Sequence, residues 1–427
     1  MNTKTILICT VGGSHQPIVT AIRDLRPDFV CFICSGKDPG TGKAGSDTQV
    51  LGKGRCIKAN YNDEKASLPN IPTQAGLAEN SYEVVTVPAD DLDGAVVVVR
   101  EALVNLGDQF TGARLVADYT GGTKTMTAAL VAAVLETDGV DLQLVTGNRA
   151  DLVKVRNGTE ASVLANIDAV RLQRGMAPYL SAWGHFAYDE SADGLASIPQ
   201  PRDRVLGSRL SRSRDLSNAF AAWDRFDHAE ALRLLEIYAA VVSGDLGRHL
   251  GALKLLVKKS DQQEPMRIFD LWRNAERRAA QGRYDDAVAR VYRLIEWSAQ
   301  WLLRLRCGIN TSDIPPERIP VGVDIPANRD GMHQAGLYAA WLMVGKLTSG
   351  PASGFTAAHL PALLGHLQIR NESILAHGFS SVEQGAWEDL RNWMDGIFLP
   401  MLLEEIKAMR LLHTMPPQLP SVYIWNN

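Results

Sequence analysis

Cysteine is scarce in this chain of 427 residues, and its pattern excludes a disulfide scaffold. Five cysteines, an odd number without regular spacing, do not form the framework typical of small secreted domains. Cys31 and Cys34 make a C-x-x-C pair, but the pair lies in the apolar run at 28–35, which is typical of a buried strand. Neither the cysteines nor the nine histidines show the spacing of a zinc site. The sequence therefore predicts no metal site.

An excess of either charge and a long apolar run are also missing. The 44 Lys and Arg against 48 Asp and Glu give a net charge of −4, so any nucleic-acid binding needs a local patch. Apolar runs such as 95–99 and 128–135 fall far short of the roughly 18 residues of a membrane helix. The N-terminus lacks the pattern of a signal peptide. We expect a cytoplasmic protein without a membrane partner.

The first 180 residues alternate short apolar runs with helical patterns. Continuous apolar strands between helices predict an α/β Rossmann-like domain with a parallel-rich sheet covered on both faces. We expect strands at 6–11, 28–35, 82–88, 113–120 and 140–148, and helices at 17–25, 91–106 and 124–137. The segment from Gly36 to Asn80 is rich in Gly, Lys and Asn, which predicts a long loop or a partly ordered lid.

Glycine-rich turns follow several of these strands at the edge where such sheets bind ligands. Thr10-Val11-Gly12-Gly13-Ser14 follows the first strand, and Thr120-Gly121-Gly122-Thr123-Lys124 follows the fourth. Glycines let backbone amides approach an anion, and the next helix adds its positive N-terminus. One such turn alone is more often a tight connection, but several at one edge favour a phosphate ligand. The Walker A and G-x-G-x-x-G patterns are missing, which disfavours ATP hydrolysis and NAD chemistry.

The strings T-V-G-G-S and D-Y-T-G-G-T-K-T-M resemble the CARF domain, the CRISPR-associated Rossmann fold. The resemblance covers roughly residues 1–180 and implies a sensor of cyclic oligoadenylates. It implies a homodimer that holds a ring-shaped ligand across its twofold axis, with a ring of four adenylates preferred. The binding residues implied are Gly12, Gly13, Ser14, Gln16, Thr120, Gly121, Gly122, Thr123, Lys124 and Met126, with Thr146, Gly147 and Asn148 after the fifth strand.

The rest of the chain is predicted to be helical. Residues 181–262 are expected to form a linker and connecting helices, and residues 263–427 an all-α domain. The stretches 216–242 and 269–306 share a faint likeness, which favours two short helical hairpins within a bundle. Near the end, Arg370 and His377 are seven positions apart, so on one helix they share a face. By itself this spacing is usually structural.

The string R-N-x-x-x-x-A-H-G, within an all-helical domain, resembles the HEPN ribonuclease signature. The resemblance spans about 265–405 and implies catalytic roles for Arg370, Asn371 and His377. It implies a composite site between two protomers and metal-independent cleavage of single-stranded RNA by 2′-hydroxyl attack. Together the two resemblances imply a ribonuclease of type III CRISPR antiviral defence whose allosteric activator is a cyclic oligoadenylate, with no further cofactor.

Two alternatives stay open at this point. The first is a ring nuclease, in which the sensor domain degrades its own cyclic ligand. The second is a ligand-responsive regulator whose helical half binds RNA or a protein without cutting. A DNA-binding role is less attractive, because no helix-turn-helix with a basic recognition helix is apparent.

Overall fold

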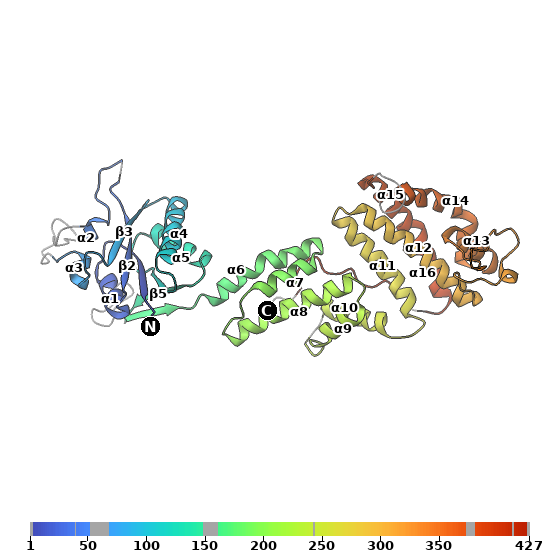
Figure 1. Cartoon of the computed structure of the whole chain (residues 1–427), viewed down its shortest axis with the longest axis horizontal. Coiled ribbons are helices and arrows are strands. Elements are labelled where there is room, and N and C mark those ends of the chain that lie inside the picture. Colours follow the sequence, from blue (N-terminus) through green and yellow to red (C-terminus); the bar gives the residue numbers. More distant parts are fainter. Residues whose placement is uncertain are drawn as a thin grey trace. The chain divides into compact units, whose positions relative to one another are not determined.

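The computed structural model divides the chain into two compact units, a first unit at Met1–Gln173 and a second unit at Arg174–Asn427 (Figure 1). The structure describes residues 3–38, 40–51, 68–147, 161–241, 244–372, 381–411 and 414–424, with only the backbone described at 367–372. The predicted domain boundaries at 180 and 262 stay predictions. The α/β fold class of the N-terminal part and the all-α class of the C-terminal part are confirmed.

The first unit contains a six-stranded sheet in the order β3-β2-β1-β4-β5-β6. The strands are β1 (Thr5–Thr10), β2 (Phe29–Ser35), β3 (Tyr82–Val87), β4 (Arg114–Asp118), β5 (Val140–Thr146) and β6 (Ala161–Ala165). The first five, all predicted, pair in parallel, and β6 pairs antiparallel with β5. The sequence analysis missed β6, a short edge strand whose residues are mostly exposed.

Helices cover both faces of this sheet because its inner strands are apolar on both sides. On one face, Ile6 and Ile8 pack with α4 (Leu92–Gln109) and α5 (Lys124–Glu136). On the other face, Leu7 and Cys9 pack with α1 (Gln16–Leu25). Figure 1 shows these two helical layers on either side of the blue strands.

The segment from Gly36 to Asn80 is more structured than predicted. Its described residues include α2 (Thr48–Leu51) and α3 (Ile71–Ala75), which add Val50 and Ile71 to the core beside α1. The Asn70 Nδ2 donates to the Val50 carbonyl at 3.1 Å and joins the two helices. For these residues the long-loop alternative is wrong, because two buried aliphatic side chains hold them against the sheet, and the partly ordered lid stays a prediction.

The C-x-x-C pair lies inside β2, as the apolar run predicted. Cys31 and Cys34 are fully buried, and burial raises the pKa of Cys34 to about 12. A thiol with such a pKa is protonated at neutral pH and is a poor nucleophile. The pair therefore serves as packing in the sheet.

The second unit is helical, as Figure 1 shows from α7 to α16. The connecting helices are α6 (Asp168–Ser181, which spans the division between the units), η1 (Ala182–His185), α7 (Tyr188–Ser197), α8 (Arg204–Asp224), α9 (His228–Glu236) and α10 (Gly244–Val257). The later elements are α11 (Gln263–Ala280), α12 (Tyr284–Cys307), η2 (Pro316–Arg318), α13 (Leu337–Leu347), α14 (Pro351–Glu372), α15 (Gln384–Trp393), the π-helix η3 (Met394–Phe398) and α16 (Leu399–Ala408).

The two predicted hairpins are present as α8–α9 and α11–α12, and their turns are alike. Phe226 and Gly282 each adopt a left-handed conformation, with φ of 65° and 73°. In both turns the amide of this residue donates to the carbonyl three positions earlier, and the next amide donates to the carbonyl five positions earlier. The glycine signals its turn in the sequence, whereas the phenylalanine does not.

The last described segment, 414–424, returns from α16 to the connecting helices. The Tyr423 hydroxyl accepts from Ser213 at 2.9 Å, and the Tyr188 hydroxyl donates to the Pro420 carbonyl at 2.7 Å. Leu419 is buried in the same core as Trp183 and Trp223. This return joins the end of the predicted HEPN range to the helices before it.

Candidate functional site

The glycine-rich turns lie at the topological switch point of the sheet. β1 and β4 are neighbours, and from them the chain continues outward to β2 and β3 on one side and to β5 on the other. The turns after β1 and β4 therefore leave the same sheet edge in opposite directions. In open α/β sheets this is the place where ligands bind.

The two turns touch through their glycines. A Cβ added to Gly121 would lie 2.3 Å from the Thr10 carbonyl oxygen, and one added to Gly12 would lie 2.6 Å from the Gly122 amide nitrogen. Gly122 also has a φ of +91°, which side chains rarely adopt. Glycine is thus required at all three positions by contact or by backbone conformation.

Threonine side chains hold the second turn in place. The carbonyl of Gly121 accepts hydrogen bonds from Thr10 Oγ1 at 2.6 Å and Thr127 Oγ1 at 2.9 Å. The Thr120 hydroxyl accepts from the Val145 amide at 2.7 Å and so joins the turn to the end of β5. These bonds fix the backbone, a condition for binding an anion through it.

Asp118, the first residue of the D-x-T-G-G string, stabilises the turn after β4 through hydrogen bonds. It is buried at the end of β4, where one carboxylate oxygen accepts from the Thr120 amide at 2.9 Å and the other from Gln143 Nε2 at 3.1 Å. Burial raises the pKa of this carboxyl, and the hydrogen bonds from Thr120 and Gln143 oppose that rise. Its role in the described structure is to shape the turn.

Two helix N-termini face the same edge. α1 begins at Gln16, and α5 begins at Lys124 after Thr123, whose hydroxyl accepts from the Met126 amide at 3.2 Å. Lys124 and Ser14 are exposed. Two positive helix ends and an ammonium group at one sheet edge form a suitable site for phosphate oxygens.

The remaining predicted ligand residues fall into three groups. Gly13 and Thr146 are exposed, and Gly147 follows β5 directly. The side chain of Met126 is fully buried in the core with α4, so it supports the turn and does not face the ligand edge. Asn148 lies outside the described residues.

The structure adds two residues that the sequence analysis did not include. Thr10 holds Gly121, as described above, and Gln49 of α2 donates from Nε2 to the Gly12 carbonyl at 2.5 Å. The Oε1 of Gln49 is buried without a hydrogen-bond partner among the described residues. No sequence signal pointed to Gln49, because its segment was predicted to be a loop.

Two of the three predicted catalytic residues lie at the end of α14. The backbone of Arg370 and Asn371 is in the last helical turn, and His377 lies outside the described residues. One turn before Arg370, the ring of His366 packs on Trp393 with centroids 4.8 Å apart. Burial lowers the pKa of His366.

The chain after this segment is anchored to α12. The Val382 amide lies 3.2 Å from both carboxylate oxygens of Asp285, in the first turn of α12. Two packed contacts therefore flank the segment from Arg370 to His377, one before it and one after it.

The described residues contain neither a candidate metal site nor a candidate membrane-spanning helix. No group of three or more His, Cys, Asp or Glu side chains in these ranges could hold a metal ion. No helix there has the length and apolar character needed to cross a bilayer.

Comparisons with known proteins agree with this architecture. A family model described as the Csm6 HEPN domain matches residues 257–398, from the end of α10 to the end of η3. Among solved structures, Csm6 of Enterococcus italicus bound to cyclic hexa-2′-fluoro-hexa-dAMP matches with a TM-score of 0.57 and 12% identity over 95% of each chain. No curated protein matched the chain. The chain thus has a fold similar to that of Csm6, and its helical part is similar to the Csm6 HEPN domain, as the resemblance implied.

Proposed function

We propose that this chain, which has the fold of Csm6 and a helical part similar to the Csm6 HEPN family, is a single-stranded RNA endoribonuclease activated by a cyclic oligoadenylate. The observation that carries the proposal is the HEPN match over 257–398, because it includes both Arg370 and His377. The ligand edge of the first unit supports the activator. The proposed setting is type III CRISPR defence in the cytoplasm.

The proposed cleavage is a transesterification. A ribose 2′-hydroxyl attacks the adjacent phosphate, the 5′-oxygen leaves, and a cyclic phosphate forms. The Arg370 guanidinium, which is always charged, holds the phosphorane oxygens, and the His377 imidazole exchanges a proton with the attacking or leaving oxygen. Asn371 orients the phosphate or the imidazole. In the proposed homodimer the Arg–His pairs of two protomers face each other, and no metal takes part.

The proposed activator lies across the twofold axis of that dimer. Its phosphates contact the turns at Gly12–Ser14 and Thr120–Lys124, where the N-termini of α1 and α5 supply positive potential. Thr146, Gly147 and Asn148 border the site. The predicted ring has four adenylates, whereas the ligand of the similar Enterococcus italicus Csm6 has six, so both ring sizes enter the test.

The test is cleavage of a quenched fluorescent RNA by the purified chain in EDTA, without activator and with rings of three, four and six adenylates. We expect cleavage with one ring only and none without a ring. Cleavage that depended on an added divalent cation would contradict the metal-free mechanism. Tight binding of a ring without cleavage would contradict the nuclease and favour a non-catalytic regulator.

Replacing Lys124 by alanine is expected to raise the ring concentration that gives half-maximal activity by a factor of about 10–100, because a charged hydrogen bond to phosphate contributes about 1.5–3 kcal/mol. The maximal rate at saturating ring stays unchanged, since the side chain acts through the affinity for the ring. The measurement is an activation curve of RNA cleavage. Lys4→Ala is the matched control, because Lys4 is exposed just before β1, at the opposite edge of the sheet. A loss of maximal rate at saturation would show that Lys124 does more than bind.

A further inference from the structure

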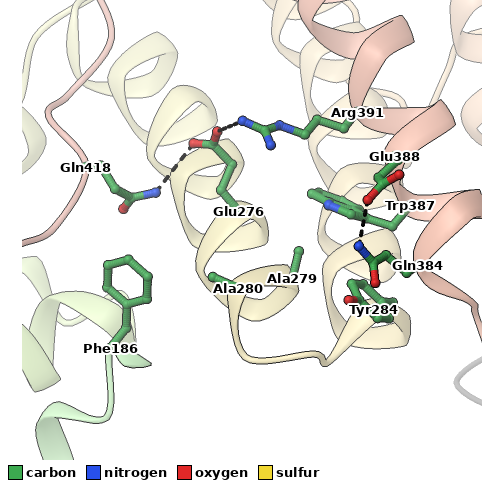
Figure 2. A pocket seen from close by; sticks show the side chains of 10 residues that line it. All are labelled: Phe186, Glu276, Ala279, Ala280, Tyr284, Gln384, Trp387, Glu388, Arg391 and Gln418. Atoms are coloured by element: carbon green, nitrogen blue, oxygen red, sulfur yellow. Dashed lines mark hydrogen bonds and ion pairs between the residues drawn. The ribbon is translucent and has the colours of Figure 1, made fainter. Parts of the chain in front are cut away.

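α15 packs on different helices through two of its faces. On one face, Trp387 stacks on Trp272 of α11 with ring centroids 6.0 Å apart. Beside this stack lies a cavity of about 340 Å³, which Glu276 of α11 also lines (Figure 2). The Glu276 carboxylate accepts from Arg273 at 2.8 Å and from Gln418 at 3.4 Å, so it is already engaged within the protein. This face of α15 therefore serves to pack the helices together.

The second face of α15 packs on α14, and the ring contacts show how the two helices run. Trp393 packs on His366 with centroids 4.8 Å apart and on Phe355, about three turns earlier in α14, at 6.1 Å. Phe355 in turn packs on Phe398, which follows Trp393 in η3, at 5.5 Å. The order of the contacts is reversed between the two helices, so they run antiparallel. The turn of α15 before Trp393 therefore lies toward the C-terminal end of α14.

Two side chains come together at that end of α14, next to the position of Arg370. His366 is four positions before Arg370, a separation of about 6 Å along the axis, and the two positions share a face of the helix. Asp389, one turn before Trp393 on α15, lies close enough to act on the His366 imidazole through its charge. Positions 351–369 of α14 contain no charged residue. A carboxylate and an imidazole thus accompany the predicted phosphate-binding arginine.

The His366 imidazole is in a state that suits a proton acceptor. The ring is half-buried, and burial lowers its pKa, while the Asp389 carboxylate raises it by a smaller amount. The ring is therefore neutral at neutral pH. In the described part of the chain neither ring nitrogen takes part in a hydrogen bond, and the buried Nε1 of Trp393 beside it lacks a partner as well. Buried polar groups are usually hydrogen-bonded, so these unused groups indicate a place that receives a ligand.

Two further titratable groups lie along the same pair of helices. His359, two turns before His366, packs on a phenylalanine of its own helix with centroids 5.7 Å apart. Asp395 of η3 lies 3.6 Å from Arg391 of α15. Neither is among the charges that shift the pKa of His366, so the pH response of this ring depends on its burial and on Asp389.

The proposed RNA cleavage needs two proton-transfer groups. The attacking 2′-hydroxyl must lose a proton while the leaving 5′-oxygen gains one, and a single imidazole cannot serve both oxygens in the same step. The string that resembles the HEPN signature supplies one imidazole, that of His377. A neutral imidazole one turn before Arg370 is placed to be the other.

We propose that His366 is the general base of RNA cleavage and that Asp389 is a positioning residue that acts on its imidazole. The inference rests on the proposed ribonuclease function. His366 takes the proton of the 2′-hydroxyl as that oxygen attacks phosphorus, the bond from phosphorus to the 5′-oxygen breaks, and His377 gives its proton to the leaving oxygen. Water then removes the proton from His366 and returns one to His377.

The experiment measures the pH dependence of kcat for RNA cleavage by the full chain at saturating ring. The variants are His366→Gln, whose amide forms hydrogen bonds but cannot accept a proton, and Asp389→Asn, which removes the charge and keeps the shape. His359→Gln is the matched control for the first, because it changes a ring-packed histidine of the same helix. Glu388→Gln is the control for the second, because it removes the neighbouring carboxylate, which holds Gln384 as Figure 2 shows.

We expect His366→Gln to lower kcat by about 100-fold or more, with little change in the KM for RNA, since general acid–base catalysis contributes about 10²–10⁴. In the wild-type chain kcat rises with pH through the pKa of His366, because only the neutral ring accepts a proton. The Asp389 carboxylate stabilises the imidazolium, so Asp389→Asn lowers this pKa further and moves the acid limb of the profile to lower pH. Both controls keep the wild-type profile. Thermal unfolding and ring binding verify that the variants are folded.

The outcomes separate the base from the nuclease. Ring-activated cleavage at the wild-type rate in His366→Gln, or a loss no larger than that in His359→Gln, would overturn the inference and leave the proposed function intact. A change confined to the KM would make His366 an RNA-binding residue and would also overturn it. An acid limb that Asp389→Asn leaves in place, or that Glu388→Gln moves equally, would remove the role of Asp389. A wild-type chain that cuts no RNA with any ring would contradict the proposed function itself, and the base with it.

Discussion

Replacing His377 by alanine is expected to lower ring-activated RNA cleavage by a factor of about 10³ or more. General acid–base catalysis alone contributes about 10²–10⁴, and the alanine cannot move a proton. Arg370→Ala is expected to have a similar effect, because the charge that develops on the phosphorane loses its guanidinium. The two losses should not add in the double variant, since both residues act on one transition state. The measurement is the initial rate of RNA cleavage at saturating ring.

A measurement of ring binding distinguishes a loss of catalysis in these variants from a failure to fold. Both variants should bind the ring with wild-type affinity, because the predicted ring site lies in the first unit and the variants change the second. His185→Ala and Arg329→Ala, two exposed positions, are the matched controls and should keep the wild-type rate. Wild-type cleavage in His377→Ala or in Arg370→Ala would show that the HEPN assignment of that residue is wrong.

Replacing Asp224 by alanine is expected to lower the free energy of unfolding of the second unit by about 3–5 kcal/mol, because it removes one partner of a buried ion pair. Asp224 Oδ1 accepts from Arg277 Nε at 2.7 Å, and Oδ2 pairs with Arg278. The Arg277 side chain is completely buried, and burial lowers its pKa, so the uncompensated charge has no access to water. The melting temperature should fall by roughly 10 °C.

Asp227→Ala is the matched control for this prediction. Asp227 lies three residues further, where its carboxylate accepts from the Glu230 amide at 3.1 Å and caps α9. Loss of such a cap costs about 1 kcal/mol, so the control should melt only slightly below the wild-type chain. Equal melting temperatures for Asp224→Ala and Asp227→Ala would contradict the view that Asp224 joins the α8–α9 turn to α11.

The elements that could be predicted are those whose sequence signal lies in neighbouring residues. The five parallel strands were predicted because each is a short stretch rich in apolar residues between helical patterns. The sequence analysis missed β6, a five-residue antiparallel strand at the edge of the sheet, because its place beside β5 is a tertiary contact. The turn at Gly282 was predicted, whereas the equivalent turn at Phe226 was not, since a phenylalanine in a left-handed conformation has no sequence signal.

The ligand-binding edge of the sheet was predicted only in part, because part of its signal is local and part comes from distant residues. The glycine-rich strings named the two turns, but only the pairing of β1 with β4 brings Gly12 against Gly122, some 110 positions away. The same packing turns the side chain of Met126 into the core and adds Gln49 to the edge. These placements depend on which faces pack together, and spacing along the chain does not encode them.

By itself, the sequence determined the order of the two parts, the five parallel strands of the sheet and the motifs that resemble CARF and HEPN, because the signal for each of these lies in neighbouring residues. The tertiary structure alone decided which distant side chains share a surface. The cavity at Glu276 is the plainest case, since its walls come from Phe186, Trp387 and Gln418. Burial of apolar surface drives that packing without regard to sequence separation, so the site appears only when the helices are assembled.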